Sequence, residues 1–213
     1  ISGTGAMKDY DVYSNKAPWS ENSDSIITVN IESGVTSIGN RAFLFCSKMT
    51  DVTIPEGVTS IGEEAFGGYG PGGGPLYCGS LTSIMIPNSV TSIGKSAFFK
   101  CSNLTSVSIG SGVTSIGSQA FYNCSNLQDG NITDMDAWCR IDFVGSYSSS
   151  STPMCQAENI YLNGEKITSV TMPQGITEVR NDTFYGFRDL VTVTIPDSVT
   201  SIGYRAFCGC SSL

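Results

Sequence analysis

Hydrophobic residues recur along this chain in blocks that return after 23 residues. Each block has the pattern L-x-x-V-x-I, so its last three positions alternate between apolar and polar, which is typical of a β-strand with one buried face. Eight blocks follow one another at spacings of 23, 32, 23, 23, 40, 23 and 23 residues. They begin at Ile26, Met49, Leu81, Leu104, Leu127, Ile167, Leu190 and Leu213. A repeated period of this length predicts a solenoid in which each repeat forms one coil.

A second string, V-T-S-I-G, follows most strand blocks and is itself followed by a small residue, a phenylalanine and a cysteine. It begins at Val35, Val58, Val90, Val113 and Val199, with a weaker copy at Ile176. Its glycine predicts a sharp corner, although Arg180 stands at that position in the weaker copy. The A-F-x-x-C stretch is too short for a free-standing helix. We therefore expect one or two helical turns there, with the Phe and the Cys pointing inward.

These parts predict a parallel sheet along one wall of the solenoid and helical turns along the opposite wall. The last aliphatic residue of each block should stack on its counterparts in neighbouring coils, about 4.8 Å apart. These residues are Ile54, Ile86, Ile109, Met172 and Ile195. Proline follows all of them except Ile109, which ends the strand where no further backbone donor is needed.

The composition removes several classes of function. The charged fraction is 14% and the formal net charge is −8, with only 11 Lys and Arg residues. Nucleic-acid binding needs clustered basic residues to neutralise phosphates, so we expect no nucleic-acid partner. The absence of histidine removes the commonest general base and metal ligand. No apolar run approaches the roughly 20 residues that a membrane-spanning helix needs.

The unit V-T-S-I-G-x-x-A-F-x-x-C-S-x-L-T-x-V-x-I-P resembles the repeat of the BspA-like leucine-rich repeat family of bacterial and protozoan surface proteins. This resemblance implies a leucine-rich repeat right-handed superhelix, a β-rich α/β solenoid over residues 26–213. Residues 1–25 resemble the capping lead-in segment before the first repeat. The family implies a cell-surface or secreted location, and some members are adhesins that bind host matrix proteins such as fibronectin. It brings no catalytic residue and no cofactor.

The chain begins in a strand-like segment at Ile1 and stops in mid-repeat at Leu213. We therefore expect a fragment whose targeting signals lie outside it.

The first insertion, at about residues 67–77, is rich in glycine and proline. It formally contains G-x-G-x-x-G, but dinucleotide binding needs a helix N-terminus directly after the glycines. Pro71, Gly74 and Pro75 disfavour such a helix, so we expect an exposed loop.

The second insertion, at about residues 133–160, predicts three local structures. A short helix should begin near Asp134 with Thr133 or Asp134 as its cap, and residues 146–152 should form a mobile polar loop. The Asn163-Gly164 pair predicts a hairpin turn. The carboxylates of Asp134, Asp136 and Asp142 suggest a calcium site, although the glycine and terminal glutamate of a calcium loop are absent and capping explains them as well. The rings of Trp138 and Phe143 predict a small satellite core rather than a ligand platform.

The repeat argues against disulfides for most of the cysteines. Five of them occupy one position in successive coils, where parallel side chains have poor geometry for bridging. They are Cys46, Cys78, Cys101, Cys124 and Cys210. We expect buried thiols that donate weakly to backbone carbonyls. A disulfide between Cys139 and Cys155, which bracket the second insertion, stays an open alternative.

The outward strand positions form a shallow, nearly uncharged strip that is rich in hydroxyls. The strip contains Thr28, Asn30, Asp51, Thr53, Ser83, Met85, Ser106, Ser108, Ser169, Thr171, Thr192 and Thr194. Such residues suit any solvated strand face, but extended repeat arrays also bind macromolecules through such faces. Competing contact residues in the insertions and the loop after them are Tyr69, Tyr77, Trp138 and Tyr147.

We therefore expect a non-catalytic module that binds a protein or a glycan, and the alternative is a structural spacer between other domains. An enzyme is a weaker alternative, because no cleft-forming element is visible in the sequence.

Overall fold

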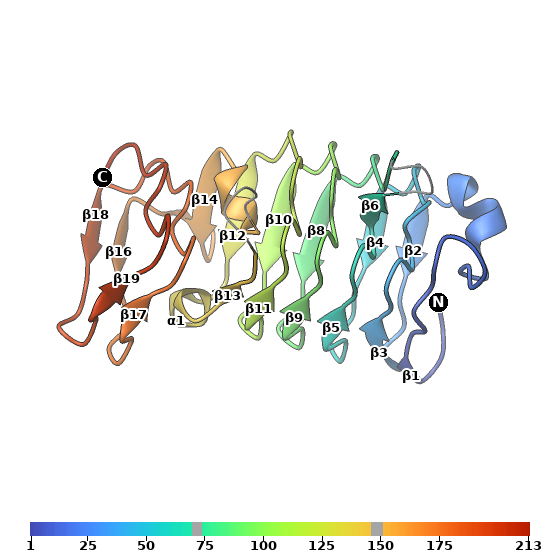
Figure 1. The fold of residues 1–213 in the computed structure, drawn as a ribbon, viewed down its shortest axis with the longest axis horizontal. Helices are drawn as coiled ribbons and strands as arrows, with labels where there is room; N and C mark the ends of the chain where they lie inside the picture. Colours follow the sequence, from blue (N-terminus) through green and yellow to red (C-terminus); the bar gives the residue numbers. More distant parts are fainter. Residues whose placement is uncertain (70–73, 146–150) are drawn as a thin grey trace.

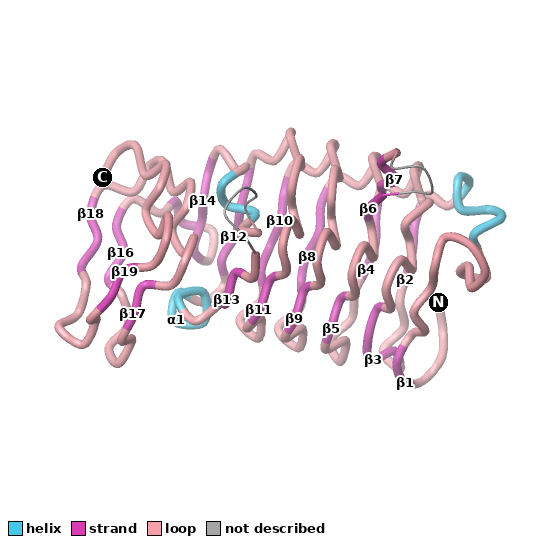
Figure 2. The backbone as a smooth tube through the Cα atoms, in the orientation of Figure 1, coloured by secondary structure: helices cyan, strands magenta, loops and turns pink. Residues whose placement is uncertain are grey.

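The computed structural model describes residues 1–69, 74–145 and 151–213. The chain winds into a solenoid of parallel strands whose two termini lie towards opposite ends of the array (Figure 1). The strands run along two walls, while the remaining backbone of each coil is built from loops and turns (Figure 2). Among the described residues, no helix is long and apolar enough to cross a membrane.

The first wall contains the strands that the L-x-x-V-x-I blocks predict and one further strand, at residues 159–162, which belongs to the predicted Asn163-Gly164 hairpin. They are β2 (Thr28–Asn30), β4 (Asp51–Thr53), β8 (Ser83–Ile86), β10 (Ser106–Ile109), β12 (Asp129–Ile132), β14 (Asn159–Leu162), β16 (Ser169–Thr171) and β18 (Thr192–Thr194). Pairing is parallel and in register, with Val107 opposite Ile84 on one side and Gly130 on the other. The predicted row of inward aliphatic residues is buried from Ile54 to Met172, whereas Ile195 in the last coil is 39% exposed.

The second wall is a further parallel sheet, which the sequence pattern predicted only as a corner. Here V-T-S-I is itself a strand. In its first copy Val35 and Ile38 face the core, and Thr36 faces solvent. The strands are β1 (Gly5–Ala6), β3 (Val35–Ile38), β5 (Ser60–Ile61), β9 (Ser92–Ile93), β11 (Ser115–Ile116), β13 (Asp142–Phe143), β17 (Glu178–Val179) and β19 (Ser201–Ile202). Strands β1 to β13 form one six-stranded sheet, and β17 pairs only with β19.

The A-F-x-x-C stretches form single hydrogen-bonded turns, so the expected helical turns do not extend into helices. In one coil the amide of Phe99 donates to the carbonyl of Ser96, and that of Cys101 donates to Phe98. A left-handed residue precedes each Ala-Phe or Thr-Phe pair and interrupts any helix. These residues are Arg41, Glu64, Ser96, Gln119, Asp182 and Arg205. The turns also bond to one another, since Phe98 donates to Ala120 of the next coil.

Aromatic rings fill the interior between the walls. Phe66, Phe98 and Phe121 stack nearly parallel, with ring centroids 5.0 and 4.9 Å apart. Trp19 ends this stack at the N-terminal side, because its indole lies on Phe43 at 5.5 Å and its Nε1 donates to the carbonyl of Ala42. The lead-in segment before β2, including the 3-10 helix η1 (Ser20–Ser25), thus covers the first coil of the core.

The glycine of V-T-S-I-G is required by close packing between coils. At Gly94 the backbone φ is not positive, but an added Cβ would lie 2.6 Å from the backbone nitrogen of Glu63 in the preceding coil. Gly62 and Gly203 meet the preceding coil in the same way. Arg180 is tolerated at this position because, within the described residues, no backbone hydrogen bond joins β17 to the preceding β13.

Replacing Gly94 with alanine is expected to lower the free energy of unfolding by about 2–3 kcal/mol, because the added methyl group overpacks a backbone contact that cannot yield. Urea denaturation followed by circular dichroism measures this loss. Arg180→Ala serves as the matched control at the equivalent position and should change stability by under about 0.5 kcal/mol. Equal effects at the two positions would show that the corner glycine is not a packing requirement.

The first insertion, predicted as an exposed loop, forms a hairpin in its described residues. Strands β6 (Gly67–Tyr69) and β7 (Pro75–Tyr77) pair antiparallel. A strand therefore follows the glycine-rich stretch, where a dinucleotide site needs a helix. The tip of the hairpin, residues 70–73, lies outside the described residues.

The second insertion contains a complete, divergent coil followed by a short hairpin. After β12 come helix α1 (Met135–Cys139), β13, the 3-10 helix η2 (Pro153–Cys155) and then β14. Strand β15 (Glu165–Lys166) turns back on β14 through Asn163 and Gly164, both with positive φ, which confirms the predicted hairpin. The chain then passes directly from β15 into β16. Within the described residues, no second-wall strand therefore stands between β14 and β16.

Both sheets are interrupted between the divergent coil and the coil that begins with β16. We call this boundary the seam. On the first wall, within the described residues, no strand pairing joins the β14–β15 hairpin to β16. On the second wall, α1 lies between β13 and β17 (Figure 1). Trp138 of α1 spans the seam, because it contacts Phe143 and Phe187 and donates its Nε1 hydrogen to the carbonyl of Thr183, 2.8 Å away. Trp138 and Phe143 therefore belong to the main core rather than to a satellite core.

Candidate binding surface

The outward strip on the first wall is a flat array of side chains with free polar groups. Ser83 and Met85 of β8 lie beside Ser106 and Ser108 of β10 in register, and Met85 is 73% exposed. The strip continues over Asp51 and Thr53 on one side of the seam, and over Ser169, Thr171, Thr192 and Thr194 on the other. Within the described residues, no side-chain hydrogen bond occupies these hydroxyl groups.

The exposed threonines of the second wall differ in this respect. The hydroxyl of Thr59 donates to the carbonyl of Thr36, that of Thr91 to Thr59 and that of Thr114 to Thr91, at 3.0–3.1 Å. These hydroxyls strengthen the contact between coils, and their hydrogens are already donated to backbone carbonyls. The hydroxyls of the strip on the first wall are therefore available to a partner, whereas those of Thr59, Thr91 and Thr114 are not.

Four outward residues of the divergent coil also belong to this face and were missed by the sequence pattern. Asp129 and Asn131 of β12 lie in register with Asn159 and Tyr161 of β14. The amide of Asn159 donates to the carboxylate of Asp129 at 3.2 Å. The 23-residue spacing places Asp129 and Asn131 beside Ser106 and Ser108, although Gly130 stands at the apolar position of that block, whereas Asn159 and Tyr161 lie outside the period. The signal available in the sequence was Gln128-Asp-Gly-Asn-Ile132, which keeps the alternation of the strand block.

The predicted contact residues of the insertions lie in different surroundings. Tyr69 and Tyr77 lie on the paired strands β6 and β7. Trp138 is only 1% exposed, so its prediction as a surface contact is wrong, because the indole fills the core at the seam. Tyr147 lies outside the described residues, as does most of the predicted polar loop. Its last two residues, Ser151 and Thr152, are buried.

The three aspartates of the calcium hypothesis have separate structural surroundings. Asp134 caps α1 by accepting from the amide of Ala137 at 2.8 Å, which confirms the predicted cap. Asp136 pairs with Arg140 at 2.9 Å, and Asp142 lies on β13. In the part of the chain that the structure describes, no group of three potential ligand residues converges as a metal site would require.

Cys46, Cys78, Cys101 and Cys124 form a buried row of thiols, whereas Cys210 in the last coil is half-buried. The Sγ atoms of Cys78, Cys124 and Cys210 donate to the carbonyl of a phenylalanine in an earlier coil, at 3.1–3.3 Å, which confirms the predicted donors. Burial raises the pKa of Cys46 and Cys124 to about 12, so these thiols are poor nucleophiles. Cys139 and Cys155 are not joined by a disulfide.

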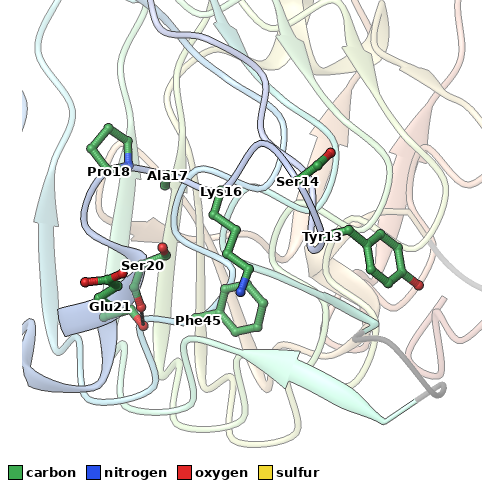
Figure 3. A pocket seen from close by; sticks show the side chains of 9 residues that line it. Tyr13, Ser14, Lys16, Ala17, Pro18, Ser20, Glu21 and Phe45 are labelled. Atoms are coloured by element: carbon green, nitrogen blue, oxygen red, sulfur yellow. Dashed lines mark hydrogen bonds between the residues drawn. The ribbon is translucent and has the colours of Figure 1, made fainter.

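An open cavity of about 550 Å³ lies at the N-terminal end of the solenoid (Figure 3). Tyr13, Lys16, Glu21 and Phe45 line it. Backbone amides of Asn15, Tyr13 and Ser14 donate to Asp11, lower the pKa of its carboxyl to about 2 and hold the loop in place. Lys16 and Glu21 are the charged side chains of its lining.

The parallel coils, the short turns and the row of inward aliphatic residues define a leucine-rich-repeat solenoid. The family model described as BspA type leucine rich repeat region matches six copies, over residues 20–70, 76–142 and 156–213. The chain therefore belongs to the BspA-type leucine-rich repeat family. None of the curated proteins compared with the chain matches it.

Several solved bacterial structures are similar. The leucine rich repeat protein of T. pallidum is 24% identical with a TM-score of 0.52, and the match covers 98% of this chain and 71% of that one. A leucine-rich repeat protein from Eubacterium ventriosum is 28% identical with a TM-score of 0.48, over 98% of this chain and 57% of that one. A leucine rich cell surface protein from Faecalibacterium prausnitzii is 26% identical with a TM-score of 0.37, covering 88% of this chain and 58% of that one. The T. pallidum match supports the fold alone.

Proposed function

We propose that this chain is a non-catalytic binding module of a secreted or cell-surface protein, and that its strip on the first wall contacts a protein partner such as an extracellular-matrix protein. The observation that carries the proposal is the flat, in-register row of unused hydroxyls around the exposed Met85. Extended repeat arrays provide large surfaces of this kind. Family membership supports the surface location and the adhesive role. A glycan partner and a purely structural spacer are the competing functions.

Saturable binding of the purified chain to a panel of immobilised matrix proteins tests this function. Replacing Ser106 and Ser108 with lysine places two long charged side chains over the centre of the strip and should weaken binding at least tenfold. The matched control replaces Thr59 and Thr114, on the second wall, with lysine and should bind like the original chain. Absence of binding to every matrix protein would favour the spacer, and equal loss in both variants would place the contact elsewhere.

A further inference from the structure

The regular coils carry small residues, mostly with hydroxyl groups, at the corner where the turns lead into the strands of the first wall. The hydroxyl of Thr82 donates to the carbonyl of Thr50, and that of Thr105 donates to Thr82. The residue directly after the buried cysteine is Ser47, Ser102 or Ser125 in three of these coils. These short side chains close the corner and leave it smooth.

The coils that flank the seam replace these short residues with long polar ones. Gln128 and Glu158 continue the column of Thr82 and Thr105, because the amide of Gln128 donates to Thr105 and that of Glu158 donates to Gln128. In the other column, Arg188 follows Phe187 where the regular coils have serine after cysteine, and Gln156 stands where they have Asn103 and Asn126. All four long residues line one groove of about 440 Å³.

The groove differs electrostatically from the rest of the molecule. Arg41, Arg140, Arg180 and Arg205 each lie within 2.6–3.5 Å of a carboxylate. In the described part of the chain, Arg188 has no such carboxylate partner. The carboxylate of Glu158 lines the same groove and is likewise not in a salt bridge with any described residue. A carboxylate, a guanidinium and side-chain amides therefore line the same groove.

The adjoining strand face carries the same change. Asp129, Asn131, Asn159 and Tyr161 stand on β12 and β14 at the positions where β8 and β10 have serine and methionine. Each of the four is half-buried. The departures from the repeat are thus gathered on both strands and along the corner that leads into them. We call the groove residues and these four residues together the seam patch.

We propose that the seam patch binds a neutral carbohydrate chain. Neighbouring sugar hydroxyls both donate and accept hydrogen bonds at a fixed spacing. Carboxylate, amide and guanidinium groups present two polar atoms in one plane and can bond such a pair at once. A phenol ring such as that of Tyr161 offers an apolar face for a sugar ring and a polar edge. The opposite charges of Glu158 and Arg188 balance in the groove, and Asp129 adds a further carboxylate on the strand face, so the patch disfavours an anionic ligand. This site goes beyond the protein-binding strip proposed above and does not depend on it.

The test is an array of neutral and acidic glycans probed with the labelled chain and with a variant that restores the repeat. The variant carries Gln128→Thr, Glu158→Thr and Arg188→Ser, the residues that regular coils have at these positions, and it is therefore expected to keep its circular dichroism spectrum and melting temperature. The original chain should bind neutral oligosaccharides, and the variant should bind them at least tenfold more weakly. The matched control, Ser83→Thr with Met85→Thr in regular strand β8, should retain full glycan binding.

Three results would overturn the proposal: no glycan bound by the original chain, binding confined to acidic glycans, or undiminished binding in the restored variant. Matrix-protein binding by the same variants separates this site from the strip, because the restored variant leaves Ser106 and Ser108 unchanged. If the original chain binds matrix proteins but no glycan, only the carbohydrate site is contradicted. If the original chain binds neutral glycans but no matrix protein, only the strip is contradicted.

Discussion

Replacing Trp138 with alanine is expected to lower the free energy of unfolding by about 3–5 kcal/mol, the usual cost of removing a buried tryptophan. The indole is 1% exposed and packs between Phe143 on one side of the seam and Phe187 on the other. Its loss also leaves the carbonyl of Thr183 without its donor, which itself costs about 1–3 kcal/mol when the group stays dry.

The same substitution should divide the unfolding transition. Trp138 is a main link across the level where both sheets are interrupted, so the coils from β16 onward should unfold at lower denaturant than the coils before the seam. Urea denaturation measures this, with far-UV circular dichroism reporting on the whole chain and the fluorescence of Trp19 reporting on the N-terminal end. Non-coincident curves are expected for the variant.

Trp138→Phe is the matched control for that experiment. It keeps an aromatic ring at the seam but removes the N–H donor, and we expect a loss of about 1–2 kcal/mol, mainly from the unpaired carbonyl. A loss under about 1 kcal/mol for Trp138→Ala, with coincident unfolding curves, would contradict the view that this residue holds the two parts of the solenoid together.

Replacing Phe98 with alanine is expected to destabilise the chain by about 3–5 kcal/mol through the cavity that it leaves. Phe98 is fully buried in the centre of the aromatic stack, with neighbouring ring centroids at 5.0 and 4.9 Å. The turns on both sides are hydrogen-bonded to the turn that contains Phe98, through Phe66 to Ala97 and Phe98 to Ala120, and these bonds oppose collapse into the space. Thermal and urea denaturation of the purified variant measure the change.

Phe45→Ala provides the comparison for Phe98→Ala, because Phe45 lies in the same kind of turn but remains half-exposed at the N-terminal cavity. We expect a loss of about 1 kcal/mol or less at this position. Equal effects at the two positions would mean that the aromatic stack contributes no more than a surface ring. A fully tolerated Phe98→Ala would show that the inward orientation of the phenylalanines is wrong.

The binding surface was accessible to sequence reasoning only where the repeat stays regular. Ser83, Met85, Ser106 and Ser108 were placed on one face because a strand alternates with a period of two. The seam patch was not, because Arg188 comes from a later coil than Gln128 and Glu158. Gln128 and Arg188 lie far apart in the sequence and come together only because of the path that the divergent coil takes. Their spacing in the sequence does not predict this arrangement.

The second wall shows a related limit. Its strands are only two to four residues long, which is too short for alternation to distinguish a strand from a corner. Pairing with the coils on either side is what makes V-T-S-I extended. The conformation of the A-F-x-x-C stretches, where helical turns were expected, also depended on neighbouring coils. The left-handed residue before each Ala-Phe or Thr-Phe pair directs amides towards the next coil.

By itself, the sequence determined the solenoid, the inward Phe and Cys rows, a helix capped by Thr133 or Asp134, and the Asn163-Gly164 turn. These features depend on local periodicity and turn chemistry, which act over a few residues. Tertiary structure alone decided that the second insertion contains a complete coil, that Trp138 is a core residue, and that both sheets are interrupted at one seam. The physical reason is that inter-coil hydrogen bonds and ring packing join residues at least a full coil apart, and they decide which side of the chain is buried.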